Sequence, residues 1–232
     1  MISVIIPTFN EEAQIAKTIR WIRRNGNEQL ITEIIVPDGG STDTTFQKAR
    51  DAGALAVVCP RKGRAAQMNY GASFAKGTVL YFLHADTLPP VNFTEDILQA
   101  VSANRCAGCF MLSFDHNHWF LKANCWFTRF NVDAVRFGDQ SLFVRRDIFM
   151  NAGKFNESLV VLEDQELIKR LKKRCAFIVV KKQVITSARK YLQNGVYRTQ
   201  GVFFVIYLMY RLGYSQQKLV STYRKLIQQD KL

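Results

Sequence analysis

The stretch EIIVPDGGSTDTT, from Glu33 to Thr45, decides the fold because it joins a strand-like run to a tight turn and a helix start. Its apolar residues are continuous and β-branched, which favours a strand buried on both faces. Ser41 is the predicted cap of a helix that runs to about Ala52 and stops at Gly53. Asp38 directly follows the strand, at the position where open α/β sheets bind ligands.

The same alternation of short β-branched runs and longer helical runs fills the first half of the chain. We predict strands at 3–7, 33–37, 55–59 and 79–83, and helices at 11–24, 41–52 and 64–75. Helices between strands of this kind indicate a mostly parallel, Rossmann-like α/β sheet with right-handed crossovers. Thr8 to Glu11 and Asp38 then lie at the same carboxyl edge of the sheet.

The second half is less regular. CAGCFMLSF (106–114) and QSLFVRR (140–146) are typical of strands, and Trp119 to Val132 is predicted to be an aromatic-rich helix across one sheet face. In VVLEDQELIKRLKKR (160–174) a helix would place Asp164 on the apolar stripe. That carboxylate is either a helix-start group favoured by the dipole or a base held in a cleft.

The cysteines and the first residues bear on the cellular compartment. Five cysteines in apolar segments favour free buried thiols in a reducing compartment, and the C-x-x-C of RCAGCF is read as two small apolar residues of a strand. MISVIIPTFN has no basic start and no cleavage site for a signal peptide, so export is not expected.

The charge is distributed very unevenly. Residues 1–168 hold 17 basic and 18 acidic side chains, net −1, whereas residues 169–232 hold 15 and 1, net +14. This excess indicates a polyanionic partner, which is nucleic acid, a phosphate-bearing substrate or an anionic membrane, with a solvated face as the alternative.

An apolar run, GVFFVIYLMY (201–210), lies inside this basic segment and is too short to span a bilayer as a helix. From Tyr191 onward we predict two helices, broken near Gly213. The apolar helix is then buried against the rest of the chain, packed in a homodimer, or laid on a membrane surface.

Two acidic residues at strand ends each have two possible roles. Asp38 accepts hydrogen bonds from a nucleotide base or ribose, or it closes the turn before Gly39 and Gly40. Asp86, in LHADTLPP, binds a hard divalent cation that also holds phosphate oxygens, or it caps its own loop.

The segments SVIIPTFNEE, EIIVPDGGSTDTT, LHADT and EDQEL, in this order and spacing, resemble the family 2 glycosyltransferases with the GT-A fold. The resemblance covers Ile2 to about Arg189. It implies a nucleotide-sugar-binding GT-A catalytic domain at 1–190 and leaves a basic and apolar helical extension at 191–232. The short length and the tail SARKYLQNGVYRT resemble a small bacterial subgroup of that family.

The resemblance also implies roles for individual residues. Nucleotide-sugar-binding positions are Thr8, Asn10, Glu11, Asp38, Arg64 and Arg189. Asp164, second in the pair with Glu163, matches the catalytic base. Asp86 matches the last acid of the D-x-D motif, which binds Mn²⁺ or Mg²⁺. His84 replaces the first acid of that motif, so either the cation is bound more weakly or His84 itself contacts the cation or a phosphate.

These residues suit an inverting transfer of a sugar from a nucleoside-diphosphate donor to an acceptor hydroxyl, with Asp164 as general base and a cation and an arginine receiving the leaving charge. The predicted setting is cytoplasmic, peripheral on the inner face of a membrane if the acceptor is lipid-linked. A nucleotidyltransferase is the alternative enzyme, although no Gly-rich basic signature opens the chain. A nucleic-acid-binding module is the alternative from another class, and acids at the predicted ligand edge argue against it.

Overall fold

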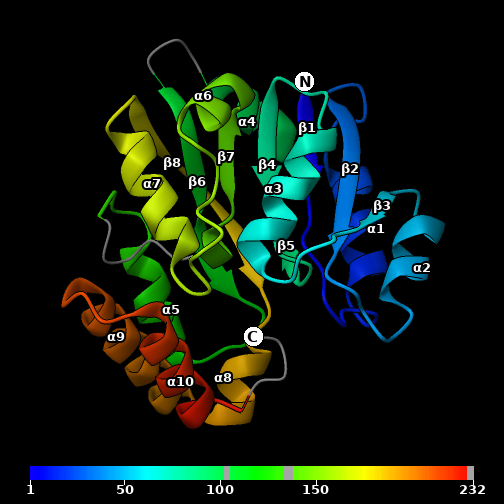
Figure 1. The fold of residues 1–232 in the computed structure, drawn as a ribbon. Helices are drawn as coiled ribbons and strands as arrows, with labels where there is room; N and C mark the ends of the chain where they lie inside the picture. The colour runs from blue at the N-terminus through cyan, green and yellow to red at the C-terminus, as the bar shows by residue number, and fades with distance from the viewer. Residues whose placement is uncertain (102–104, 133–137, 229–232) are drawn as a thin grey trace.

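One mixed sheet organises the chain (Figure 1). The structure, a computed structural model, describes residues 1–101, 105–132 and 138–228. Within them the sheet has eight strands in the order β3-β2-β1-β4-β7-β6-β8-β5. The strands are β1 Ile2–Ile5, β2 Ile31–Asp38, β3 Leu55–Val58, β4 Val79–Phe82, β5 Thr87–Leu88, β6 Arg105–Phe114, β7 Leu142–Arg145 and β8 Ala176–Thr186.

The parallel half of the sheet confirms the predicted α/β fold class. β1 pairs in parallel with both β2 and β4, and β2 pairs in parallel with β3. All residues of β1 and β4 are buried, as expected for continuous apolar strands covered on two faces. β7 then runs antiparallel to β4 and β6, while β6 and β8 are parallel to each other. The carboxyl ends of β1, β2, β4, β6 and β8 therefore lie at one edge.

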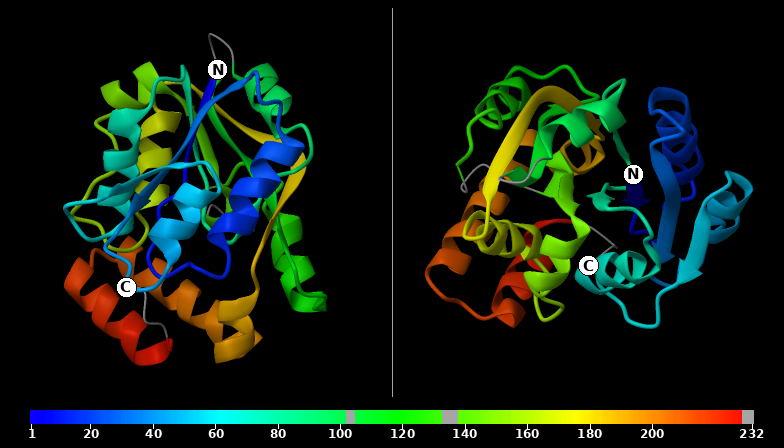
Figure 2. Two further views of the ribbon diagram at one scale, coloured as in Figure 1. Left: turned by 90° about the vertical axis from the view of Figure 1, so that its right-hand side faces the viewer. Right: turned by 90° about the horizontal axis from the view of Figure 1, so that it is seen from above.

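Helices cover both faces of the sheet (Figure 2). They are α1 Ile15–Asn25, α2 Thr45–Asp51, α3 Arg64–Phe74, α4 Phe93–Ala100, α5 Trp119–Phe127, α6 Arg146–Asn151, α7 Glu163–Lys172, α8 Arg189–Asn194, α9 Val196–Arg211 and α10 Gln216–Leu226. α1, α2 and α4 share one apolar core with the sheet, and α3, α6 and α7 share the other. α8, α9 and α10 lie beneath the carboxyl edge (Figure 1).

Two predicted helix starts were wrong, for the same physical reason. α2 begins at Thr45 with Thr44 as its N-cap rather than Ser41, and α1 begins at Ile15 rather than Glu11. The hydroxyl of Ser41 donates to Asp38 and accepts from the Asn10 amide. Local side-chain bonds thus compete with the helix and keep both segments as loops.

The C-terminal region forms three helices where two were predicted. The break between α8 and α9 is at Gly195, and the break between α9 and α10 is near Gly213 as expected. Both glycines have a positive φ angle, 84° and 80°, a backbone conformation that residues with a side chain rarely adopt. α9 and α10 pack as an antiparallel hairpin on a shared core that includes Val202, Ile206 and Leu219.

The prediction of five free thiols was wrong for two of them. Cys106 and Cys175 form a disulfide with a Cα–Cα distance of 6.0 Å, while Cys59, Cys109 and Cys125 are free and buried. The neighbouring residues explain the proximity, because Arg105 of β6 pairs with Ala176 of β8 in the parallel ladder. This pairing could not be predicted because β8 was not recognised as a strand.

The length and polarity of the helices bear on whether the chain could span a bilayer. In the described ranges, no helix is sufficiently long and apolar to cross a membrane.

Candidate active site

The sheet topology brings the predicted site residues to one edge. Thr8 follows β1, Asp38 ends β2, Asp86 follows β4 and Arg189 follows β8. β7 runs in the opposite direction, so Asp139, just before it, reaches the same edge. This is the edge at which open α/β sheets place their ligands.

Asp38 organises the turn that follows β2. Its Oδ1 accepts from the amides of Gly40 (3.0 Å) and Ser41 (2.7 Å), and its Oδ2 accepts from the hydroxyls of Thr8 (3.0 Å) and Ser41 (2.6 Å). Four such bonds match the lone-pair capacity of a carboxylate. The structure therefore shows Asp38 closing the turn, which is one of its two predicted roles. A nucleotide contact by Asp38 requires Thr8 or Ser41 to change partner.

The loop after β1 is tied to the same turn. Asn10 has a positive φ of 52°, and its Oδ1 accepts from the amide of Thr42 at 2.9 Å. The amide of Glu11 donates to the hydroxyl of Thr45 at 2.7 Å. These bonds fix the loop backbone and leave the carboxylate of Glu11 to face Arg189.

Gln67 holds the two strand ends together and was missed in the sequence. Its buried amide donates to the carbonyls of Thr8 (2.6 Å) and Pro37 (3.1 Å). A Cβ on Gly39 would meet the Gln67 amide nitrogen at 2.9 Å, so this glycine gives Gln67 its room. Gly39, the first glycine of the pair, is the sequence feature that could have indicated this contact.

Asp86, Arg189 and Glu11 form the first charged cluster. Arg189 Nη2 lies 3.5 Å from Glu11 Oε2 and 3.8 Å from Asp86 Oδ2. Burial raises the pKa of Asp86, and the charges of Asp139 and Glu11 raise it further, against His84 and Arg189. The structure thus brings three predicted residues from three separate segments into one group.

Arg64, Glu163 and His84 form the second cluster. Arg64 Nε lies 2.9 Å from Oε1 of Glu163, whose side chain is 1% exposed. Arg64 Nη1 lies 3.1 Å from His84 Nε2, and His84 Nδ1 lies 3.1 Å from Asp139 Oδ1. A neutral His84 carrying its proton on Nδ1 would donate to Asp139 and accept from Arg64. Asp139 was not predicted as a site residue.

Burial and charge act against each other in this cluster. Burial raises the pKa of Glu163 to about 7, although Arg64 opposes the shift. The charge of Glu163 is the main reason that the pKa of Arg64 is raised. Burial is the largest single effect on both His84 and Asp139 and disfavours their ionisation. Their mutual hydrogen bond and the neighbouring opposite charges together outweigh it, so the pKa of His84 is raised and that of Asp139 is lowered.

Asp164 adjoins the second cluster at the start of α7. It is 8% exposed, and its charge raises the pKa values of both Arg64 and His84. The inward orientation expected from the helical stripe is therefore present. In this position the carboxylate adjoins the basic groups rather than solvent.

The residues near Asp86 offer few ligands to a divalent cation. Among the described residues, no group of three or more His, Cys, Asp or Glu side chains could hold a metal ion. Both ring nitrogens of His84 have partners, which leaves the carboxylate of Asp86 as the hard oxygen donor. One carboxylate fits a cation that takes its remaining ligands from phosphate oxygens and water.

The C-terminal hairpin supports the start of α7. Oε1 of Gln216 accepts from the amides of Val160 (3.1 Å) and Val161 (3.3 Å), just before Glu163. Val161 and Leu162 also pack against the apolar core of the hairpin. The extension at 191–232 therefore contacts the backbone that carries Glu163 and Asp164.

Comparison with known proteins identifies the family. The model of glycosyl transferase family 2 matches residues 3–150, and the chain belongs to this family. Glycosyltransferase AglE of Haloferax volcanii is 25% identical over 183 residues, which cover 73% of this chain and 60% of AglE. Protein RfbJ of Shigella flexneri is 44% identical over 63 residues, covering 27% of this chain and 46% of RfbJ. The chain thus spans about half the length of these curated relatives.

Solved structures agree on the GT-A fold. The mannosyltransferase PcManGT from Pyrobaculum calidifontis, in complex with GDP-Man and Mn²⁺, has a TM-score of 0.72 at 15% identity, covering 97% of this chain and 67% of that chain. Glucosyl-3-phosphoglycerate synthase from Mycobacterium tuberculosis, in complex with Mn²⁺, UDP and phosphoglyceric acid, has a TM-score of 0.62 at 19% identity. The match covers 92% of this chain and 78% of that chain.

Proposed function

We propose that the protein transfers a sugar from a nucleoside-diphosphate donor to an acceptor hydroxyl with inversion at the anomeric carbon. The observation that carries this proposal is the convergence of Asp86, Arg189 and Glu11 with the Arg64, His84 and Glu163 cluster at the carboxyl edge. Membership of glycosyl transferase family 2 and the ligands of its structural neighbours support the same reaction.

Each group has a role in this reaction. Asp164 accepts the proton of the acceptor hydroxyl as general base. Arg189 and Arg64 stabilise the negative charge on the departing diphosphate, and Glu163 fixes the guanidinium of Arg64. Asp86 would hold a Mn²⁺ or Mg²⁺ ion, which would supply Lewis-acid neutralisation of the phosphate charge. Thr8, Asn10 and Asp38 shape the loops that receive the nucleoside.

A thermal-shift panel tests the donor class. Binding stabilises the folded chain by RT ln(1 + [L]/Kd), so a true donor raises Tm above that of the unrelated nucleotides. UDP, GDP and their sugars are measured with and without Mn²⁺, and the Asp86→Asn variant is the control for the cation effect. No stabilisation by any nucleoside diphosphate would contradict the proposal.

We also propose that the outer face of α9 contacts an anionic membrane surface, where the acceptor is lipid-linked. The apolar run is divided between two surroundings, because Val202 and Ile206 are buried whereas Phe204 is 64% and Leu208 47% exposed. The net charge of +14 in residues 169–232 favours anionic lipid.

Liposome flotation tests this contact. The protein should float with anionic vesicles at low salt, less with neutral vesicles, and less again after Phe204→Glu and Leu208→Glu. A second copy of the chain on the same face would instead give a dimer in solution that the two substitutions disrupt. Absence of binding to anionic vesicles at low salt would refute membrane contact.

A further inference from the structure

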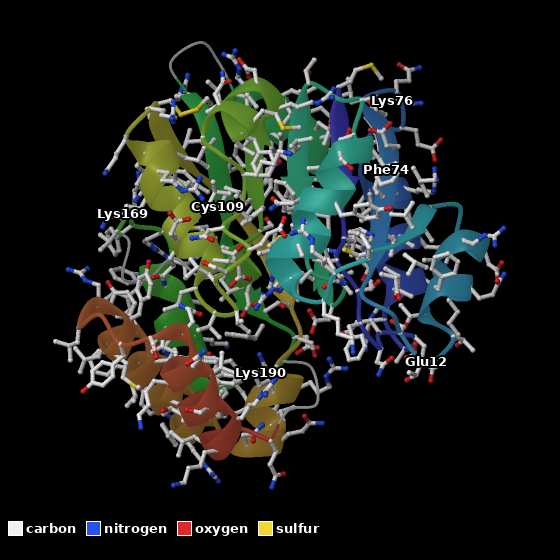
Figure 3. All side chains as sticks on the ribbon, in the orientation of Figure 1. Glu12, Phe74, Lys76, Cys109, Lys169 and Lys190 are labelled. Atoms are coloured by element: carbon white, nitrogen blue, oxygen red, sulfur yellow. A yellow bond between two sulfur atoms is a disulfide. The ribbon has the colours of Figure 1, made fainter. Side chains whose placement is uncertain are left out.

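Lys190 is a charged group of the site region that the reaction above does not use. It follows Arg189 on α8, and Figure 3 labels it between the C-terminal helices and the carboxyl edge of the sheet. Its ammonium nitrogen lies 5.6 Å from the ring centre of Phe203 on α9 and 6.0 Å from that of Tyr223 on α10. The two rings are stacked 6.3 Å apart with 11° between their planes.

The surroundings of Lys190 differ from those of a surface lysine. Burial lowers the pKa of Lys190; the charges of Asp139 and Asp86 oppose this shift, whereas those of Arg64 and Arg189 add to it, so the ammonium interacts electrostatically with charged groups of both clusters. Among the described residues, its ammonium makes cation–π contacts but has no ion-pair or hydrogen-bond partner. An ammonium held by two aromatic faces keeps its donors available to an anion.

From this arrangement we infer that Lys190 binds a phosphate group of the substrate, with the C-terminal hairpin holding its ammonium in place. This inference rests on the proposed function for the identity of the substrate. Arg189, its neighbour in the chain, contacts Asp86, the residue that we propose holds the cation. We therefore expect the bound phosphate to be part of the donor diphosphate.

The inference gives the hairpin a second role. Phe203 and Tyr223 come from α9 and α10, so residues far along the chain would define the position of a phosphate ligand at the sheet edge. The extension would then contribute to donor binding as well as to membrane contact. A lysine gives a compact point charge, and a charge-assisted hydrogen bond to phosphate contributes roughly 10- to 100-fold in affinity.

Calorimetric titration of the full chain tests the inference. Lys190→Met should weaken binding of UDP or GDP and of pyrophosphate by roughly 10- to 100-fold, with little change for the nucleoside alone. Lys190→Arg should recover part of the affinity, and Phe203→Leu should reduce the affinity less than Lys190→Met does. Lys218→Met, an exposed lysine on α10, is the matched control and should leave binding unchanged. Thermal melting of each variant confirms folding.

The outcomes separate the inference from the proposed function. Lys190→Met could instead weaken only the binding of inorganic phosphate to the nucleotide-saturated protein. In that case Lys190 binds a phosphorylated acceptor, and the phosphate site still stands. Binding of pyrophosphate that depends on Lys190, without binding of any nucleoside diphosphate, would contradict the proposed donor and keep the site. Equal binding by wild type and Lys190→Met, or no binding of either anion by wild type, would overturn the inference.

Discussion

Asp164 and Glu163 are adjacent in the chain but have different surroundings. Glu163 is almost completely buried and contacts Arg64, whereas Asp164 adjoins the basic cluster without an ion pair at contact distance in the described residues. A general base must reach the substrate proton, and a buried acid paired to arginine is better placed to fix that arginine. The two acids are therefore separable by substitution.

Asp164→Asn removes the proposed base and keeps its size. Transfer should fall by roughly 10²- to 10⁴-fold while affinity for the nucleoside diphosphate stays close to wild type. Initial rates with the donor identified by thermal shift, together with binding isotherms, measure the two effects. Asp51→Asn, an exposed acid at the end of α2, should retain full activity. A fully active Asp164→Asn enzyme would exclude this residue as the base.

Glu163→Gln should change how stability depends on pH. Burial raises the folded-state pKa of Glu163 from 4.5 to about 7, so the folded chain binds this proton more tightly than the unfolded chain. Its contribution to stability is therefore present at low pH and is lost as pH rises from 4.5 to about 7. Urea unfolding across this range should show a decline in wild type that Glu163→Gln lacks. Parallel curves for the two proteins would contradict the shift.

Residue-scale prediction from the sequence succeeded where a residue follows a strand. Asp38 and Asp86 were placed at the sheet edge because their strands are short, apolar and easily recognised. Asp139 and Lys190 were missed because neither follows a predicted strand: one precedes an antiparallel strand, and the other follows β8. Their positions depend on strand pairing and on the hairpin, which single-sequence patterns do not define.

At the scale of elements, the hairpin of α9 and α10 joins the site to the basic segment. Its core residue Leu219 is fully buried, and Val161 from the loop before α7 packs into the same core. The hydrogen bonds from Val160 and Val161 to Gln216 add a polar connection. Loosening the hairpin should thus disturb the start of α7.

Leu219→Ala tests this coupling. Removing a fully buried leucine should cost about 2–5 kcal/mol of unfolding free energy and lower transfer activity as the loop before Glu163 loses its packing. Leu55→Ala, at a leucine that is 47% exposed on β3, should change both quantities little. Urea unfolding and initial rates measure the two effects. Unchanged stability in Leu219→Ala would contradict the packing described.

Element prediction was accurate for β1 to β4 and weaker afterwards. The first four strands are continuous apolar runs, whereas β8 mixes buried and exposed positions and includes Lys181 and Lys182, so no simple period marks it. The predicted helix from Trp119 to Val132 ends earlier, at Phe127. In the C-terminal region the pattern indicated helices correctly, but Gly195 was not recognised as a break.

At the scale of the whole molecule, the disulfide links two neighbouring strands that are distant in sequence. Cys106 and Cys175 are separated by 69 residues, which include β7, α6 and α7. Closing a loop of this length lowers the entropy of the unfolded chain, which raises the free energy of unfolding by about 4 kcal/mol in the chain-entropy model. The bond therefore stabilises the half of the sheet that the sequence predicted least well.

Thiol titration tests the disulfide. The denatured, unreduced protein should expose three thiols and the reduced protein five. The Cys106→Ser, Cys175→Ser double variant should melt at a lower temperature, whereas Cys59→Ser keeps the bond and serves as the control. Five reactive thiols without reductant would show that the bond does not form.

The bonds from Val160 and Val161 to Gln216 also have a consequence for synthesis. The amide of Val160 and the side chain that accepts from it are 56 residues apart. A nascent polypeptide can therefore expose Glu163 and Asp164 well before the segment that anchors them has left the ribosome. Chemical competence would then arise late in translation, after α10 has folded back against a loop made much earlier.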